Sequence, residues 1–373
     1  MLKSLTIGDL TVEKPVIQGG MGVGISLHRL AGAVAKAGGL GIISAAQIGF
    51  TEEDFAKQPE QANLRAIRKE LAKARELAQG GAVGFNIMVA TNQYKEQVKE
   101  AIKAGADIII SGAGLPVSLP EFAREAYEEL GQIPKRLTKL APIVSTAKAA
   151  SVICRLWDRK YQTAPDLVVI EGPLAGGHLG FSREQLTEYG ADTEDVEKTY
   201  RKDVYDEEIG AILKVVDEYS QKYHRHIPVA IAGGVYTHED VLHQLSLGAD
   251  AVQVATRFVT TQECDAPLAY KEAYLAAKKE DIVITKSPVG MPGRAIRNQF
   301  LEAVSRGDRP AIRHCYRCLE RCDIAKIPYC ITQALVNAAK GDLAQALLFC
   351  GSNAFRADHI ERVDEVMAEL VGE

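Results

Sequence analysis

Residues 167–181 read LVVIEGPLAGGHLGF, and this stretch decides the fold. It begins with four apolar residues between Pro165 and Gly172, which predicts a short strand buried on both faces. The strand leads into AGGH, where two adjacent glycines let the backbone approach a planar or anionic group closely. His178 adds the one side chain that titrates near neutral pH. An isolated GGH is more often a tight turn with a surface histidine, but several other strand ends in this chain look alike.

Short apolar runs of this kind recur with helical stretches between them, which is the pattern of repeated βα units. The predicted strands are 15–18, 40–44, 82–88, 107–110, 142–145, 167–171, 228–232 and 251–254. Eight strands within about 260 residues match a TIM, or (β/α)8, barrel. The alternative, a doubly wound open sheet, would need fewer strands or a complete GxGxxG, and residues 20–24 offer only part of it. We therefore predict an α/β barrel over residues 1–265.

The pattern changes after residue 265, where only helices are predicted. They cover 267–280, 294–306, 330–340 and 355–371. Residues 266–373 are therefore predicted to form a C-terminal helical appendage beside the barrel mouth. Arg294 and Arg297 lie three residues apart on one of these predicted helices, either as an anion-binding pair or as an ordinary salt-bridged face. Residues 182–206, which are polar and lack apolar periodicity, are predicted to form a long loop or lid.

Composition excludes several classes of function. The chain has 373 residues, 47% of them hydrophobic and 25% charged, with a formal net charge of −5. No basic run suggests binding to nucleic acid. No apolar run approaches the roughly 18 residues of a membrane span, and the N-terminus lacks the features of a signal peptide. We expect a cytoplasmic enzyme that acts on a small molecule; a homodimer is considered, and the oligomeric state stays open.

In barrels of this type the active site lies at the carboxyl ends of the strands. The residues at those ends are small, glycine-rich and rarely charged, which suits a flat cofactor bound through backbone groups and an amide such as Asn86. The last two strands commonly bind phosphate in barrels, so FMN fits better than a dinucleotide. The candidate cofactor-binding residues are Gly19, Gly20, Met21, Asn86, Glu171, Gly176, Gly177, Gly233, Gly234, Ala255 and Thr256.

Six motifs, in order, resemble those of the nitronate monooxygenase family, formerly called 2-nitropropane dioxygenases. They are QGGMG at 18–22, KAGGLGII at 36–43, GFNIM at 84–88, EGPLAGGHLG at 171–180, PVAIAGGV at 228–235 and GADAVQVATRF at 248–258. The resemblance covers residues 1 to about 300. The same superfamily contains the flavin-dependent enoyl-ACP reductases, so the resemblance is specific for the superfamily and less so for the reaction.

The resemblance implies an FMN-dependent oxidoreductase in which His178 is the active-site histidine. Gly20 and Met21 would line the isoalloxazine, and Asn86 and Glu171 would bind polar atoms of the flavin or its ribityl chain. Gly177, Gly233, Gly234 and Thr256 would hold the phosphate end.

The reaction implied first is oxidation of an alkyl nitronate with dioxygen to a carbonyl compound and nitrite. The alternative is an NAD(P)H-dependent enoyl-ACP reductase, although Leu174 stands where such enzymes usually carry an acidic residue before AGGH. A flavin- or cluster-carrying accessory protein is the alternative of another class.

Four cysteines near the C-terminus have the spacing C-x2-C-x3-C-x7-C. They are Cys315, Cys318, Cys322 and Cys330. Four thiolates in a short segment could hold zinc or an iron–sulfur cluster, although the spacing matches no standard zinc site. Buried or redox-active free thiols are the alternative interpretation.

Overall fold

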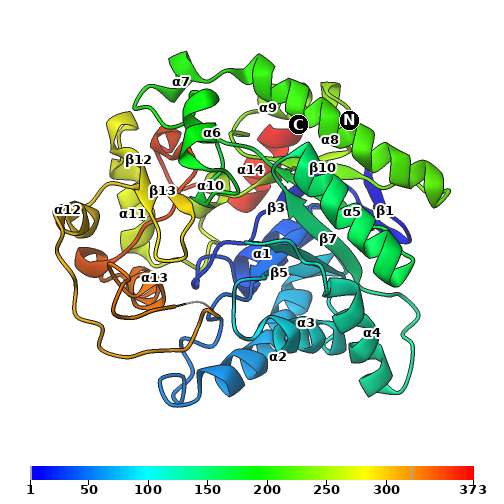
Figure 1. Cartoon of the computed structure of the whole chain (residues 1–373), viewed down its shortest axis with the longest axis horizontal. Coiled ribbons are helices and arrows are strands. Elements are labelled where there is room, and N and C mark those ends of the chain that lie inside the picture. Colours follow the sequence, from blue (N-terminus) through cyan, green and yellow to red (C-terminus); the bar gives the residue numbers. More distant parts are fainter. Residues whose placement is uncertain (1, 321) are drawn as a thin grey trace.

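The computed structural model describes residues 2–320 and 322–373, and its centre is a closed ring of eight parallel strands. The strands are β3 (Val16–Gln18), β4 (Gly41–Ser44), β5 (Val83–Met88), β6 (Ile108–Gly112), β7 (Lys139–Val144), β8 (Val168–Glu171), β10 (Val229–Ala232) and β11 (Ala251–Val254). The ring closes beside β4, where the backbone N–H of Gln18 donates to Leu40 O and that of Leu40 donates to Val16 O, both at 2.9 Å. The predicted (β/α)8 barrel is confirmed (Figure 1).

The strands are apolar on both faces because the barrel interior and the surrounding helices each bury one of them. Val169 packs inside the barrel with Ile17 and Ile42, whereas its neighbours Val168 and Ile170 pack outward against helices. This alternation with period two explains why the strands appear in the sequence as continuous apolar runs.

A short N-terminal hairpin, which the sequence analysis did not predict, closes the amino end of the barrel. It consists of β1 (Leu5–Ile7) and β2 (Leu10–Val12), whose four leucine, isoleucine and valine side chains join the interior cluster. Asp9 in its turn pairs with Lys139 at the start of β7. The hairpin covers the amino end of the barrel, whereas a cavity opens at the carboxyl ends of the strands.

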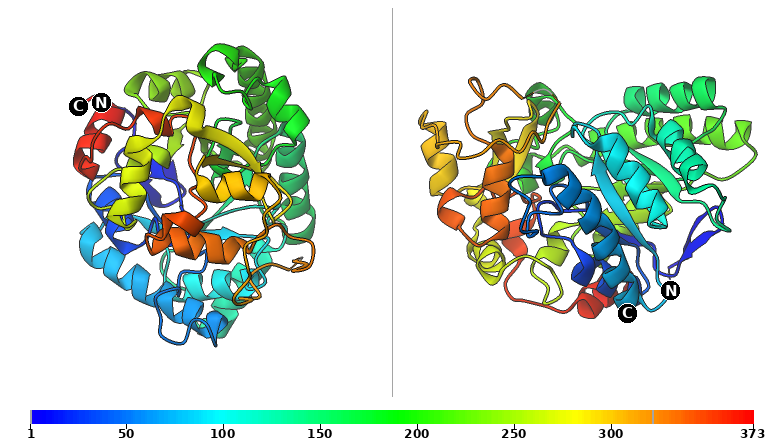
Figure 2. Two further views of the ribbon diagram at one scale, coloured as in Figure 1. Left: turned by 90° about the vertical axis from the view of Figure 1, so that its left-hand side faces the viewer. Right: turned by 90° about the horizontal axis from the view of Figure 1, so that it is seen from below.

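Helices surround the barrel in chain order. They are α1 (His28–Lys36), α2 (Pro59–Ala78), α3 (Tyr94–Lys103), α4 (Leu119–Leu130), α5 (Ala147–Tyr161), α8 (Lys202–Lys222) and α9 (His238–Ser246). The eighth position is filled by the last helix of the chain, α14 (Val363–Val371), which packs between α9 and α1 and shares their hydrophobic cluster. The two termini consequently lie close together (Figures 1 and 2).

Because α14 packs with the barrel helices, the last residues of the chain belong to the barrel layer. The predicted division into two domains at residue 265 stays a prediction. The segment before α14 contains α11 (Leu268–Ala276), α12 (Gln299–Ser305), α13 (Ile331–Ala339) and the short helices α10 (Thr256–Val259), η1 (Lys279–Asp281), η2 (Leu343–Gln345) and η3 (Ala354–Arg356). In the right-hand view of Figure 2, α12 and α13 lie on the far side of the barrel from the N-terminal hairpin. They therefore stand at the open, carboxyl end.

Two strands in this segment differ from the prediction of helices alone. β12 (Ile282–Lys286) and β13 (Pro292–Ile296) form an antiparallel hairpin, and β13 also pairs with β9 (Gly177–His178). Arg294 thus lies on a strand, and the helix predicted at 294–306 begins only at Gln299. The prediction of a helix pair Arg294/Arg297 is wrong because Pro292 and Gly293 favour an extended start to this stretch.

The segment predicted as a long loop is partly helical. It contains α6 (Arg183–Glu188), α7 (Val196–Thr199) and the first turns of α8. α6 begins with a capping box in which the Ser182 side chain accepts from Gln185 N, and the Gln185 side chain accepts from Ser182 N. This local signal was present in the sequence although apolar periodicity was not.

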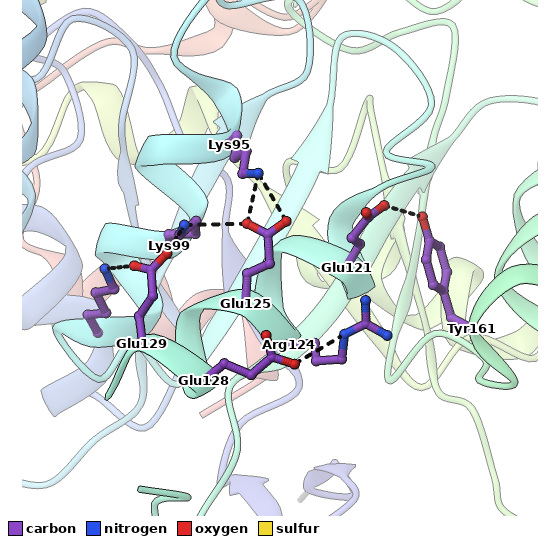
Figure 3. A network of polar contacts seen from close by, with 9 residues as sticks. Lys95, Lys99, Glu121, Arg124, Glu125, Glu128, Glu129 and Tyr161 are labelled. Atoms are coloured by element: carbon purple, nitrogen blue, oxygen red, sulfur yellow. Dashed lines mark hydrogen bonds and ion pairs between the residues drawn. The ribbon is translucent and has the colours of Figure 1, made fainter. Parts of the chain in front are cut away.

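Charged side chains join the outer faces of α3 and α4. Lys95 pairs with Glu125 at 2.8 Å, and Lys99 contacts both Glu125 and Glu129 (Figure 3). These pairs are largely exposed and each contributes little to stability. Within the residues that the structure describes, no helix is both long and apolar enough to cross a membrane.

Candidate active site

A cavity of about 660 Å³ opens at the carboxyl ends of the barrel strands. All twelve residues predicted for the catalytic and cofactor-binding site line it. They are Gly19, Gly20, Met21, Asn86, Glu171, Gly176, Gly177, His178, Gly233, Gly234, Ala255 and Thr256. The structure therefore brings together, at the ends of the five strands β3, β5, β8, β10 and β11, residues that span more than two hundred positions of the sequence.

His178 is held by the C-terminal segment. It belongs to the two-residue strand β9, which pairs with Gly293 of β13. Its Nε2 lies 2.6 Å from Ser287 Oγ, and its ring meets the edge of Phe349 at 4.8 Å between centroids. Burial lowers the pKa of His178 to about 4, so the imidazole is neutral at pH 7. A neutral imidazole can accept a proton or a hydrogen bond from a substrate.

Glu171, the last residue of β8, places a partly buried carboxyl in the same cavity. Its Oε2 accepts hydrogen bonds from Gly180 N at 2.8 Å and from Ser145 Oγ at 3.4 Å. The Tyr205 hydroxyl donates to the Glu171 carbonyl oxygen at 2.9 Å and fixes the strand end. Burial raises the pKa of the Glu171 carboxyl to about 7, so near neutral pH it can either donate or accept a hydrogen bond.

Glycine is required at Gly20 and at Gly233 because the backbone is crowded there. A Cβ on Gly20 would lie 2.3 Å from the Cβ of Asn86. Gly233 has φ +99°, and its Cβ would lie 3.0 Å from Ala175 N and Gly172 O. These positions let the chain pass close to the side of the cavity without filling it.

Unpaired polar groups gather near the last two barrel strands. The backbone N–H groups of Gly176, Gly233 and Gly234 have no protein acceptor within the described parts of the chain. There too the Ser352 hydroxyl is buried without a hydrogen-bond partner. Thr256 Oγ1 accepts from Gly351 N at 2.9 Å, which brings the loop of Ser352 against β11. Donors of this kind fit a phosphate, so the cavity suits a planar cofactor that ends in one.

The C-terminal segment contributes further lining residues that were not predicted from the sequence, among them Met291, Leu335, Phe349, Gly351, Ser352 and Asn353. Ser287 of the same segment contacts His178 without lining the cavity itself. Asn353 Nδ2 donates to Gly234 O at 2.8 Å, which joins this segment to the glycines after β10. A signal was available, because the apolar run 346–350 ends in Gly-Ser-Asn just as the barrel strands end in glycines.

The four clustered cysteines lie apart from the lining of this cavity. Cys315 and Cys322 are exposed, and Cys318 and Cys330 are partly buried. Among residues 2–320 and 322–373 the structure contains no group of three or more His, Cys, Asp or Glu side chains arranged to hold a metal ion. The predicted zinc or iron–sulfur site therefore receives no support from the structure.

A (β/α)8 barrel whose cavity combines unpaired backbone donors with a neutral histidine has the features of an enzyme site for a phosphate-bearing cofactor. The chain belongs to the nitronate monooxygenase family, whose model matches residues 3–373. The resemblance seen in the six motifs is thereby confirmed. Membership of this family supports an enzyme that acts on a small molecule with a flavin as cofactor.

Relatives and solved structures agree with this assignment. The probable nitronate monooxygenase of Staphylococcus saprophyticus is 27% identical over 329 residues, 82% of each chain. That of Staphylococcus aureus strain Newman is 28% identical over 333 residues, 81% of each chain.

Among structures, FabK from Thermotoga maritima is 25% identical with a TM-score of 0.66, covering 97% of this chain and 92% of FabK. The nitroalkane oxidase from Streptomyces ansochromogenes shares the fold with a TM-score of 0.66 at 20% identity, covering 96% and 95%.

Proposed function

We propose that this protein is an FMN-dependent nitronate monooxygenase, which oxidises alkyl nitronates with dioxygen to a carbonyl compound and nitrite. The observation that carries the proposal is a single cavity with a neutral histidine and a cradle of unpaired N–H and hydroxyl groups. Family membership and the relatives named probable nitronate monooxygenase support the reaction.

The residues for holding FMN follow from the cavity. Gly176, Gly233, Gly234 and Ser352 would surround the phosphate with donors that lack protein partners. Gly20 and Met21, together with Asn86 and Glu171, would meet the ring system and its polar atoms. When bound, FMN supplies the electron transfer between the organic substrate and dioxygen.

His178 supplies the acid–base function in this proposal. Its Nε2 is engaged by Ser287, so the ring is held in one orientation. The other ring nitrogen, Nδ1, has no hydrogen-bond partner in the described residues and is available to substrate. A neutral imidazole at that position can orient a nitronate through a hydrogen bond or take the α-proton of a neutral nitroalkane.

Aerobic turnover of propane-2-nitronate by the full-length, FMN-loaded protein tests the proposal. We expect acetone and nitrite to appear together without any pyridine nucleotide. The enoyl reductase alternative predicts no nitrite, and instead consumption of NADH or NADPH with an enoyl thioester. A flavin-free protein that turns over neither substrate would favour an accessory role.

A further inference from the structure

Arg294 is a buried cation that makes no direct ion pair with any residue that the structure describes, and the more distant Asp192 carboxylate favours its charged form. Its side chain is 1% exposed, and in the described residues no Asp or Glu lies within 4 Å of its nitrogens. The guanidinium donates only to backbone carbonyls: Nη1 to Pro173 O at 2.9 Å and to Ala175 O at 2.5 Å, and Nη2 to Ala191 O at 2.5 Å. Burial lowers the pKa of Arg294 to about 10, which leaves it positively charged at pH 7. Such a charge is costly to bury without an anion nearby.

Two of the three carbonyls that Arg294 binds, those of Pro173 and Ala175, belong to the loop that borders the phosphate end of the cavity. Leu174, Ala175 and Gly176 line the cavity, whereas Arg294 does not, so the loop lies between the guanidinium and the cavity. In a planar trans peptide the N–H points opposite to the C=O. The hydrogen bond to Ala175 O therefore turns the N–H of Gly176 away from Arg294. This is one of the N–H groups without a protein acceptor.

We propose that Arg294 is a positioning residue for the phosphate of the flavin: it fixes the 173–176 loop with its N–H groups toward the phosphate and supplies the positive charge behind them. The inference rests on the proposed FMN cofactor. A bound phosphate dianion would add a counter-charge to that of the more distant Asp192 carboxylate. The donors that surround the proposed phosphate position are neutral hydroxyl and backbone N–H groups, so the positive charge would come from Arg294.

The rival explanation is that Arg294 is purely structural, since it also joins β13 to Ala191 in the lid segment. The two explanations differ in their dependence on the phosphate. A purely structural residue affects every flavin alike, whereas a charge that serves the phosphate affects FMN and not riboflavin, which has the same ring and ribityl chain without the phosphate.

The test compares FMN and riboflavin binding to the full-length protein after removal and reloading of flavin, followed by quenching of flavin fluorescence. For Arg294→Met we expect FMN affinity to fall at least tenfold and riboflavin affinity to change less than twofold. The ionic-strength dependence of FMN binding should also weaken. Arg297→Met is the matched control, because Arg297 is more exposed, lies 3.7 Å from Glu194 and should leave both affinities unchanged.

Equal loss of FMN and riboflavin affinity in Arg294→Met would overturn the role in phosphate binding, as would unchanged FMN affinity. If Arg294→Met does not fold by circular dichroism, Arg294→Lys replaces it. That variant keeps the charge but cannot reach three carbonyls, and should lose FMN affinity selectively by a smaller factor; a loss equal for both flavins contradicts the proposal. If the wild-type protein binds neither flavin, the proposed function fails as well, which separates the two failures.

Discussion

Replacing Glu171 by glutamine is expected to stabilise the flavin-free protein above neutral pH and to leave its stability near pH 4 unchanged. The Glu171 carboxyl is partly buried, and the loss of solvent around it raises its pKa from 4.5 to about 7. Between these values the folded protein keeps a proton that the unfolded chain has released, so stability falls as the pH rises. At about 1.36 kcal/mol per pH unit, the cost is about 3 kcal/mol at pH 8. Glutamine cannot ionise, and its amide oxygen can still accept from Gly180 N.

Differential scanning calorimetry of the two flavin-free proteins measures this effect. With an unfolding entropy of about 2.1 cal/mol/K per residue, about 3 kcal/mol corresponds to a rise in Tm of about 4 °C for the variant at pH 8. The difference should shrink to about 1 °C or less at pH 4.5. Glu207→Gln, at an exposed position of α8, is the control and should change Tm little at either pH. A Tm difference independent of pH would refute the reasoning.

Three further substitutions test individual contacts. His178→Ala should lower kcat/KM for a nitronate about 100-fold while FMN binding persists, and full activity would contradict the role of this imidazole. Ser287→Ala removes the 2.6 Å contact to His178 and should lower kcat about tenfold in steady-state kinetics, with little change in Tm. An unchanged kcat would mean that Phe349 alone orients the His178 ring. Gly20→Ala should weaken FMN binding about tenfold in fluorescence titration, because the new Cβ would displace Asn86. Normal FMN affinity would show that Asn86 can move aside without loss of the binding site.

The barrel and the core of its site could be predicted because both depend on local patterns. Each strand is a short apolar run, and the parallel arrangement brings all the strand ends to one rim. Glycines such as Gly20 and Gly233 mark that rim because larger side chains do not fit. His178 was recognisable for the same reason, since it follows the glycines at the end of β8.

The part of the site that comes from the C-terminal segment depends on contacts between distant residues. β9 has two residues and exists only because β13, more than a hundred positions later, pairs with it. Ser287 reaches His178 through that pairing, and Ser352 is held at the cavity beside the contact of Asn353 with Gly234. The spacing of apolar residues within a segment does not reveal contacts between distant residues. The segment was therefore predicted to be helical, and its site residues were not predicted.

The central claim is that a nitronate delivers electrons to the flavin in this cavity without help from a pyridine nucleotide. Its most direct test is the visible absorbance of the FMN-loaded protein under anaerobic conditions, with propane-2-nitronate, NADH or NADPH added in separate cuvettes. The account predicts rapid loss of the flavin absorbance with the nitronate alone, and its return when dioxygen is admitted. Rapid loss with a pyridine nucleotide and none with the nitronate would contradict the account and favour an enoyl reductase.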